Sequence, residues 1–599
     1  MLKRFFLNML SSFVGAWIAL ALLIVSLFLL MFGMMGSVAI SSASNAESLK
    51  SRSILKIDLD GPIIEREMAT EPDLMSVLNG SITAPQTLDV IVESIGEAAT
   101  NDNIVALYLN CGSLAAGPST LDAIRNALMD FKKKTEGKKK IVAYAESFSQ
   151  GAYFVASLAD EIYMNPAGEF SLTGLASQNF YLKGLFDKLG VQFQVVKVGT
   201  YKSAVEPYIL TDMSEPARAQ MDTLLSNMWQ YLRTKMAEPR KKVSAQSIDS
   251  LINRDHISFA RAQLAINAGL VDSLYYDRQL KARLADLAGC EVKKLNFVGP
   301  KTLVSETPWS DAYDSKKQIA VLYACGEIAD GNSNEINYED LVPVIIDLAD
   351  DKNVKGLVLR VNSPGGSVYG STLIGEALDY FQSKGKPLAV SMGDYAASGG
   401  YWISACADRI FADPLTITGS IGIFGMIPNI EGTLDKLGVN IATVSTNPGA
   451  NFPSLTKSMD ATQLDVMQKY VDRGYDDFTN RVAKGRKLPK AKVLAIAEGR
   501  VWDAQKAMKI GLVDSLGYLQ DAIDWTARKA GVASSYDVAA YPKVSPNFWM
   551  MLQSGAMSMA QIKAAGELHN EEMLKQYLLQ RILSRKTIQA RMPEFKVTL

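Results

Sequence analysis

The chain of 599 residues carries 62 Lys and Arg against 63 Asp and Glu, so its formal net charge is −1 at pH 7. That balance argues against a nucleic-acid-binding protein, which needs an excess of basic residues on one face. A hydrophobic fraction of 48% and a charged fraction of 21% are typical of globular chains with a large core. The basic run at 132–140 is explained more simply as a solvated loop or helix end.

Histidine and cysteine are scarce. The four cysteines are Cys111, Cys290, Cys325 and Cys406. Their spacing matches neither a metal-binding motif nor a dense disulfide framework, so no metal or cofactor is expected. The two histidines, His256 and His569, lie in segments without any other sign of an active site. A Ser-His-Asp triad is therefore a poor explanation of any hydrolase chemistry in this chain.

The N-terminal region predicts a membrane anchor. Residues 13–40 contain no charged side chain, and about 20 apolar residues suffice to cross a bilayer. Lys3 and Arg4 precede this stretch, which favours a cytoplasmic N-terminus and an exported body. Residues 1–46 are thus interpreted as a cytoplasmic tip and an uncleaved transmembrane helix. A long cleaved signal sequence is the alternative.

An internal repeat organises the rest of the chain. Phe186–Val191 (FDKLGV) recurs as Leu434–Val439 (LDKLGV), an offset of 248 residues. Gly269–Leu274 (GLVDSL) returns unchanged as Gly511–Leu516. The second offset is 242 residues. Because recurrence at nearly the same offset indicates duplicated structural units, two related halves are expected after the anchor.

These halves are predicted over 50–300 and 316–540, with a linker at 301–315 and a helical tail at 541–599. In each half, β-branched runs alternate with helical patterns, which is typical of βαβ units around a parallel sheet. In the second half, strands are predicted over Ile319–Tyr323, Gly356–Val361 and Leu388–Met392, and helices over Tyr338–Asp350, Val368–Ser383 and Tyr401–Ala407. The expected fold class is α/β.

Two strand-to-helix junctions of the second half carry candidate chemistry. Asn362–Ser367 (NSPGGS) places paired glycines before a helix, where backbone N–H groups can hold an oxyanion, although a tight structural turn would look the same. Asp394–Tyr401 (DYAASGGY) places Ser398 among small residues at a helix start. There the hydroxyl is accessible as a nucleophile, and an ordinary helix-capping serine is the alternative.

A third candidate, Lys202, lies in the first half within Gly199–Tyr208 (GTYKSAVEPY). Alone it would be interpreted as a solvated surface charge. The repeat offset of 248, however, pairs Ser398 with Gln150 and Lys202 with Ala450. Since each half keeps one group of the pair, we expect the two halves to share one site.

Lysine can act as the base only when it is neutral. Its reference pKa is about 10.4, and burial can lower this by up to about 3–5 units because water no longer stabilises the ammonium. A shift of about 3 units corresponds to about 4 kcal/mol, which a desolvated cleft can supply. Because neither histidine lies in a segment that looks like an active site, a Ser-Lys pair is the simplest hypothesis for the catalytic groups.

At these residues the sequence resembles the signal peptide peptidase A, or protease IV, family of long, duplicated, membrane-anchored serine peptidases. The motifs that carry the resemblance are Asn362–Gly366, Ala397–Tyr401, Gly419–Gly422 and Tyr201–Ser203. The resemblance covers nearly the whole chain. It implies tandem Clp-protease/crotonase-like repeats, a homotetramer with inward-facing grooves, and cleavage of signal peptides left in the membrane.

By motif position, the resemblance implies Ser398 as nucleophile, Lys202 as general base and Ser420 as a serine that helps to position the lysine. It implies an oxyanion hole at the backbone N–H groups of Gly365, Gly366 and Gly399. The corresponding segment of the first half, Asn110–Leu114 (NCGSL), lacks the Ser-Pro-Gly-Gly cradle. A second active site is therefore not expected there.

Two rival functions remain: an acyl-CoA enzyme that uses the same glycine cradle, and a non-catalytic membrane-anchored assembly scaffold. The expected partners are signal peptides and other apolar peptides, the membrane and further copies of the chain. The expected location is the bacterial inner membrane, crossed once, with the N-terminus cytoplasmic and the catalytic body periplasmic.

Overall fold

The computed structural model describes residues 49–66, 86–254, 257–304, 309–331, 335–543 and 588–592. The predicted anchor at 13–40, both histidines and most of the predicted helical tail lie outside these residues. Among the helices that the structure describes, none is long and apolar enough to cross a membrane.

The first sheet is formed by the first half and is parallel throughout its main path. Its strands, in spatial order, are β10 (Phe297–Val298), β1 (Ser53–Ile64), β3 (Ile104–Ala115), β4 (Lys140–Ala145), β5 (Glu161–Met164) and β9 (Ser273–Leu274). One face packs against α3 (Leu88–Thr100), α4 (Pro118–Lys134) and α5 (Gln150–Ala156), and the other against α11 (Asp277–Ala288). Burial on both faces explains the nearly continuous apolar runs of these strands.

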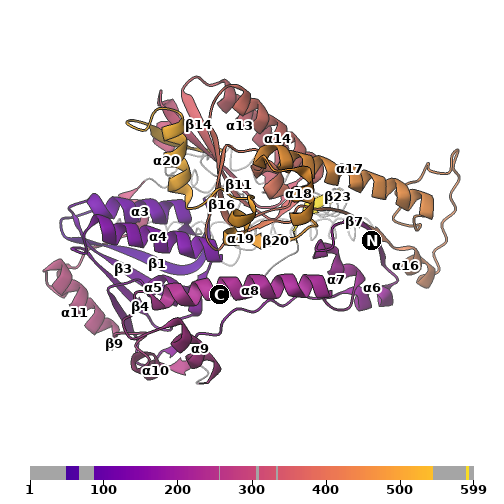
Figure 1. Cartoon of the computed structure of the whole chain (residues 1–599). Helices are drawn as coiled ribbons and strands as arrows, with labels where there is room; N and C mark the ends of the chain where they lie inside the picture. Colours follow the sequence, from indigo (N-terminus) through magenta and orange to yellow (C-terminus); the bar gives the residue numbers. More distant parts are fainter. Residues whose placement is uncertain are drawn as a thin grey trace, which may run out of the picture.

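The second half builds a similar sheet. Its strands, in spatial order, are β20 (Val501–Asp503), β18 (Ile417–Gly419), β16 (Leu388–Ala397), β14 (Val354–Ser363), β11 (Gln318–Cys325) and β22 (Asp537–Tyr541). Strand β17 (Arg409–Ala412) also pairs with β16, and β21 (Ser515–Leu516) pairs with β17. Helices α13 (Tyr338–Asp350), α14 (Val368–Ser383) and α17 (Ala461–Arg486) cover one face, and α20 (Leu519–Lys529) covers the other (Figure 1). The bounds of α13 and α14 are those that the sequence predicts.

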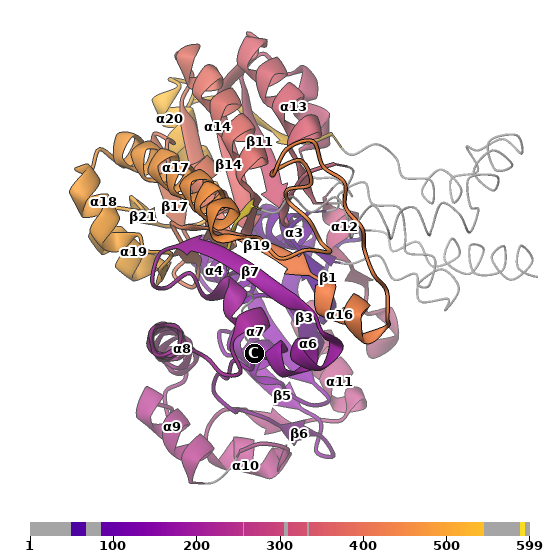
Figure 2. The same cartoon turned by 90° about the vertical axis from the view of Figure 1, so that its right-hand side faces the viewer.

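A third sheet joins the two halves. Its spatial order is β13 (Ile336–Asn337), β12 (Ile328–Ala329), β15 (Gly365–Ser367), β23 (Ile588–Arg591), β19 (Ile423–Asn429) and β7 (Gln192–Val198). Strand β7 belongs to the first half, yet seven of its residues pair antiparallel with β19 of the second half. Figure 2 shows the two strands side by side. This crossing carries the chain that follows β7 into the second half.

Several helices and strands flank this core. They are α6 (Lys183–Leu189), α7 (Glu206–Ile209), α8 (Glu215–Ala237), α9 (Ala245–Asn253), α10 (Ala262–Asn267), α12 (Pro300–Leu303), α15 (Gly399–Ser404), α16 (Glu431–Lys436), α18 (Lys490–Ile496), α19 (Ala504–Ile510), β2 (Gln86–Thr87), β6 (Glu169–Phe170) and β8 (Ala260–Arg261). Helix α8 contacts both α5 and β20, so it spans the two halves.

Buried polar contacts lock the halves together. Arg360 on β14 forms a bidentate pair with Glu65 at the end of the β1 segment, with N–O distances of 2.8 and 3.0 Å. Asp394 on β16 accepts hydrogen bonds from the backbone N–H of Ser119 and the hydroxyl of Thr120 on α4. These side chains are almost fully buried, so separating the halves would leave charges unpaired in the interior.

Candidate active site

Ser398 occupies the sharp junction between β16 and α15. Its backbone has φ 55° and ψ −116°, a region that residues other than glycine rarely adopt. Two hydrogen bonds hold this conformation: the Ser398 N–H donates to the Gly419 carbonyl, and the Ser398 carbonyl accepts from the Trp402 N–H, each at 2.8 Å. Strain of this kind is typical of sites that hold a nucleophile at a strand-to-helix turn.

The structure brings Lys202 to this serine from 196 positions away in the sequence. The Lys202 Nζ atom lies 2.8 Å from Ser398 Oγ. The same nitrogen lies 3.1 Å from both the hydroxyl and the carbonyl oxygen of Ser420. All three residues are completely buried. The three side chains that the resemblance names thus form one hydrogen-bonded cluster.

The environment of Lys202 disfavours its charged form. Burial holds the pKa of the Lys202 amine well below its ordinary value of 10.5, because the ammonium would lose its hydration. Among the described residues, no carboxylate forms an ion pair with it. The surrounding acceptors are hydroxyl and carbonyl oxygens, which are compatible with a neutral amine. The site therefore has the electrostatics that a lysine base requires.

A turn of the second half clamps the segment that carries Lys202. The Tyr201 N–H donates to the Glu498 carbonyl at 2.9 Å, and the Glu498 carboxylate accepts from the backbone and hydroxyl of Thr200, both at 3.0 Å. Gly499, at φ 71°, packs so closely that a Cβ there would lie 2.7 Å from the Cβ of Lys202. The sequence analysis missed this turn, because nothing in its local pattern shows that it contacts residues 200–202.

The glycine cradle lies directly against Ser398. Gly365 and Gly366 have φ values of 100° and 153°, so both need glycine. The position that a Cβ on Gly365 would take lies 2.6 Å from the Gly399 nitrogen and 2.9 Å from the Ser398 Cβ. The glycine cradle and the backbone at the start of α15 therefore lie directly beside the Ser398 side chain.

The equivalent position in the first half has no such chemistry. Gln150 is buried at the start of α5, and its side-chain amide is fully engaged with the loop at 173–174. The Gln150 carbonyl accepts from the N–H groups of Thr173 and Gly174 at 3.1 and 2.9 Å, and its NH2 group donates to the Gly174 carbonyl at 3.0 Å. Ala450, the repeat partner of Lys202, is exposed.

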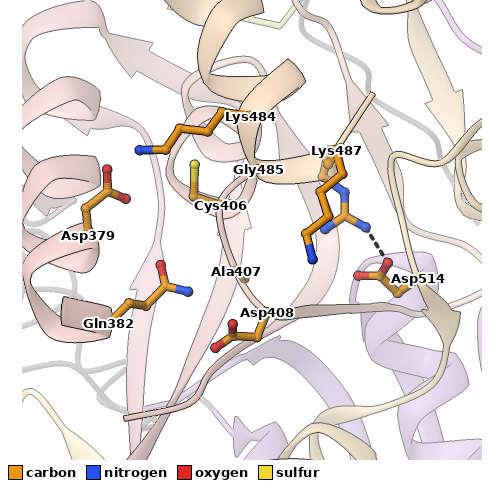
Figure 3. Close-up of a pocket in the computed structure, with 10 residues that line it drawn as sticks. Asp379, Gln382, Cys406, Ala407, Asp408, Lys484, Gly485, Lys487 and Asp514 are labelled. Atoms are coloured by element: carbon orange, nitrogen blue, oxygen red, sulfur yellow. Dashed lines mark hydrogen bonds and ion pairs between the residues drawn. The ribbon is translucent and has the colours of Figure 1, made fainter. Parts of the chain in front are cut away.

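A separate pocket of about 430 Å³ lies between α14, α17 and the loop after α15 (Figure 3). Within its lining, Arg486 contacts Asp514, and Asp379 pairs at 2.9 Å with Arg481, which lies outside the lining. The pocket shares no residue with the Ser398 cluster.

Comparison with known proteins identifies the relatives of this chain. The model of peptidase family S49 matches residues 133–291 and 380–533, one stretch in each half. Protease 4 from Haemophilus influenzae is 36% identical over 497 residues, which cover 81% of this chain and 80% of that protein. Protease 4 from Salmonella typhi is 36% identical over 84% of this chain and 82% of that protein. A protein named putative signal peptide peptidase SppA from Enterococcus faecium is 38% identical over 38% of this chain and 67% of that protein.

Proposed function

The chain belongs to peptidase family S49 and is a serine endopeptidase of the signal peptide peptidase A, or protease IV, type, and we propose that Ser398 and Lys202 form its catalytic dyad. The observation that carries the proposal is the 2.8 Å contact between these two side chains, which come from different halves. Both are fully buried, and both lie in strained or clamped segments. A capping serine and a surface lysine would have neither property.

In the proposed reaction, neutral Lys202 accepts the Ser398 hydroxyl proton as Oγ attacks the scissile carbonyl. The tetrahedral intermediate collapses when the resulting ammonium gives its proton to the leaving amine. Lys202 then removes a proton from water, which attacks the acyl ester and releases the second product. One base thus serves both half-reactions, as histidine does in a Ser-His-Asp triad.

The backbone around Ser398 is proposed to stabilise the oxyanion. Gly365 and Gly399 lie beside Ser398, and we assign the backbone N–H groups of Gly365, Gly366 and Gly399 to the negative charge that develops on the substrate carbonyl oxygen. Without substrate, the Gly365 N–H donates to the Ser363 hydroxyl at 3.2 Å. Ser420 is proposed to orient the base, because its hydroxyl and carbonyl oxygens both accept hydrogen bonds from the Lys202 Nζ atom at 3.1 Å.

The proposed substrates are cleaved signal peptides and other apolar peptides. A relative named putative signal peptide peptidase supports this class, and Ser398 lies beside the glycine cradle of β15. Residues 13–40 are proposed to anchor the catalytic body at the outer face of the bacterial inner membrane, close to such peptides.

We further propose a homotetramer of Clp-protease/crotonase-like repeats. An arm at 437–444 exposes Leu437, Val439, Ile441 and Val444 to solvent. Contiguous exposed apolar side chains of this kind mark an assembly surface.

The test is hydrolysis of an apolar signal-like peptide by the purified protein, with Ser398→Ala and Lys202→Ala measured beside it. Both variants should keep the fold and lose at least about 10³-fold in kcat/KM, the effect of removing a nucleophile or its base. Near-normal turnover by Lys202→Ala would exclude lysine as the base. No hydrolysis by the wild type would favour the scaffold or acyl-CoA alternatives.

A further inference from the structure

A cavity of about 700 Å³ lies between the two halves. Helices α3 and α4 of the first half form one wall, and residues of β11, α20 and β22 of the second half form the other. Figure 1 shows α20 above α3 and α4. A volume of this size is typical of ligand-binding sites, and none of Lys202, Ser398 and Ser420 lines the cavity. The cavity is therefore a candidate binding site separate from the catalytic cluster.

The lining combines apolar walls with an excess of acidic groups. Seven of the described lining residues are Asp or Glu, whereas Lys134 and Arg360 are the two basic ones. Arg360 is already paired with Glu65, one of the seven, and Lys134 is exposed at the end of α4. The apolar walls include Leu88, Val92, Phe131, Trp309 and Leu519. This lining favours a ligand that joins a positive charge to apolar groups.

Helix α3 brings three carboxyl groups to the cavity at a spacing of four residues. Asp89, Glu93 and Glu97 lie on one face of the helix because of this spacing, and like charges so placed repel one another. Burial and the carboxylates of Asp89 and Glu97 raise the pKa of Glu93 to about 7. Among the described residues, no basic group forms an ion pair with Glu93, and its buried Oε2 atom accepts no hydrogen bond. A cation bound beside Glu93 would supply the missing partner.

The second half contributes two buried polar groups to the lining. They are the hydroxyl of Tyr323 on β11 and the Oδ2 atom of Asp413 after β17, and these residues are 1% and 3% exposed. Neither atom has a hydrogen-bond partner within the part of the chain that the structure describes. The Asp89 carboxylate raises the pKa of both Tyr323 and Glu93, so these two groups lie near the same carboxyl. Buried polar groups without a partner indicate a ligand that supplies one.

We propose that this cavity binds the amino-terminal end of a short apolar peptide. The α-ammonium group pairs with Glu93, the Tyr323 hydroxyl and the Asp413 carboxyl form hydrogen bonds with the peptide's amide groups, and its apolar side chains pack against the walls. Each hydrolysis by a serine endopeptidase creates a new α-amino group, so the enzyme's own products have this chemistry. The inference goes beyond the proposed function, because the site lies outside the catalytic cluster.

A peptide bound in this cavity would contact both halves at once. It would therefore stabilise the docked arrangement, which also brings Lys202 to Ser398. A ligand that binds only the folded, docked chain raises its melting temperature in proportion to the logarithm of the ligand concentration. At a concentration about 100-fold above Kd, the increase should be about 2 °C. The site thus couples the presence of apolar peptides to the integrity of the enzyme.

The experiment is calorimetric titration of the purified full chain with leucyl-leucinamide, which has a free α-amino group and no carboxylate. The chain should carry Ser398→Ala, so that the probe is not hydrolysed and binding is independent of the dyad. N-acetyl-leucyl-leucinamide lacks the charge, and hexylamine lacks the amide groups; each should bind at least about tenfold more weakly. Equal affinity of the acetylated probe would overturn charge recognition, equal affinity of hexylamine would overturn the assignment to a peptide, and no binding of leucyl-leucinamide would overturn the site.

Two substitutions in the lining locate the bound probe. Glu93→Gln should weaken binding of leucyl-leucinamide at least about tenfold, and Tyr323→Phe about fivefold. Glu376→Gln, at an exposed carboxylate on α14, is the matched control and should leave the affinity unchanged. Full affinity in whichever of the two lining variants folds would place the probe elsewhere and overturn the proposal. With Ser398 intact, Glu93→Gln should hydrolyse a signal-like peptide at the normal rate, so failure of this site and failure of the dyad are distinguishable.

Discussion

Replacing Lys202 with methionine should abolish activity and change stability in a way that depends strongly on pH. Methionine has a similar length and no charge, so it fills the same buried space. Burial lowers the pKa of Lys202 in the folded chain, whereas the unfolded chain restores the ordinary value of 10.5. Between these two values the unfolded chain binds one more proton than the folded chain. The stability of the lysine protein therefore rises with pH across this window.

The magnitude follows from the linkage between protonation and folding. Each pH unit within the window is worth about 1.4 kcal/mol, so keeping the amine neutral costs about 3 kcal/mol at pH 8 and less than about 1 kcal/mol at pH 10. Losing the two hydrogen bonds to Ser420 offsets about 2 kcal/mol of this. The methionine protein should be the more stable by about 1 kcal/mol at pH 8 and the less stable by about 1 kcal/mol at pH 10.

Denaturant unfolding at pH 8, 9 and 10 measures this difference. Both proteins should carry Ser398→Ala, so that neither is catalytically active and only the side chain at position 202 differs. Lys138→Met, at a side chain that is 77% exposed, gives the baseline for the same replacement on the surface. A difference that stays flat between pH 8 and pH 10 would mean that Lys202 keeps its proton in the folded chain. The reasoning that makes it a base would then be refuted.

Three further substitutions are expected to have distinct effects. Ser420→Ala removes a hydrogen-bond acceptor that favours the ammonium form of Lys202, so it should lower the pKa of Lys202 further. The acid limb of the pH profile of kcat/KM should then move to lower pH. Because the lysine also loses a positioning contact, kcat should fall about 10- to 100-fold. Glu65→Gln leaves Arg360 buried without its counter-ion and should reduce the free energy of unfolding by about 3–5 kcal/mol, measured by thermal and denaturant unfolding. Gly365→Ala places a Cβ among the backbone atoms of the proposed oxyanion hole and should lower kcat by at least about 10²-fold.

Each substitution also has a contrary outcome. An acid limb that moves upward in Ser420→Ala would contradict an accepting role for the hydroxyl. Unchanged stability of Glu65→Gln would mean that the buried pair does not hold the halves together. Gly96→Ala on α3, where a Cβ meets no other atom within 4 Å, is the control for the glycine substitution. If both glycine variants lose the same activity, crowding near Ser398 is not the cause.

Local sequence pattern predicts much of the second half. Helices α13 and α14 begin and end at the predicted residues, because their apolar positions repeat at helical spacing and turn signals bound them. Strand β16 is longer than the predicted Leu388–Met392 and continues to Ala397. Helix α15 begins at Gly399, two residues before the predicted start. Element types are therefore more predictable here than their ends.

Contacts between distant segments could not be predicted in this way. Glu498 and Gly499 contact the segment that carries Lys202, although they lie almost 300 residues away in the sequence. These contacts require both halves to be folded. Strand β23 is short and lies in the region that the sequence predicts as helical tail. Its strand conformation depends on edge pairing with β15 and β19, which no local pattern shows.

The crossing of β7 explains why the two halves can share one site. Lys202 comes four residues after the end of β7, all seven residues of which pair with β19. The second half therefore sets the position of Lys202, although this residue belongs to the first half. The same docking removes water from the lysine and brings it within 2.8 Å of Ser398. Docking of the two halves therefore has two effects at Lys202. It buries the amine, which lowers the pKa of the lysine, and it brings the amine close enough to take the Ser398 hydroxyl proton. A chain in which the halves fold but do not dock would have a solvated lysine and an unassisted serine, and it should be inactive even with both motifs intact.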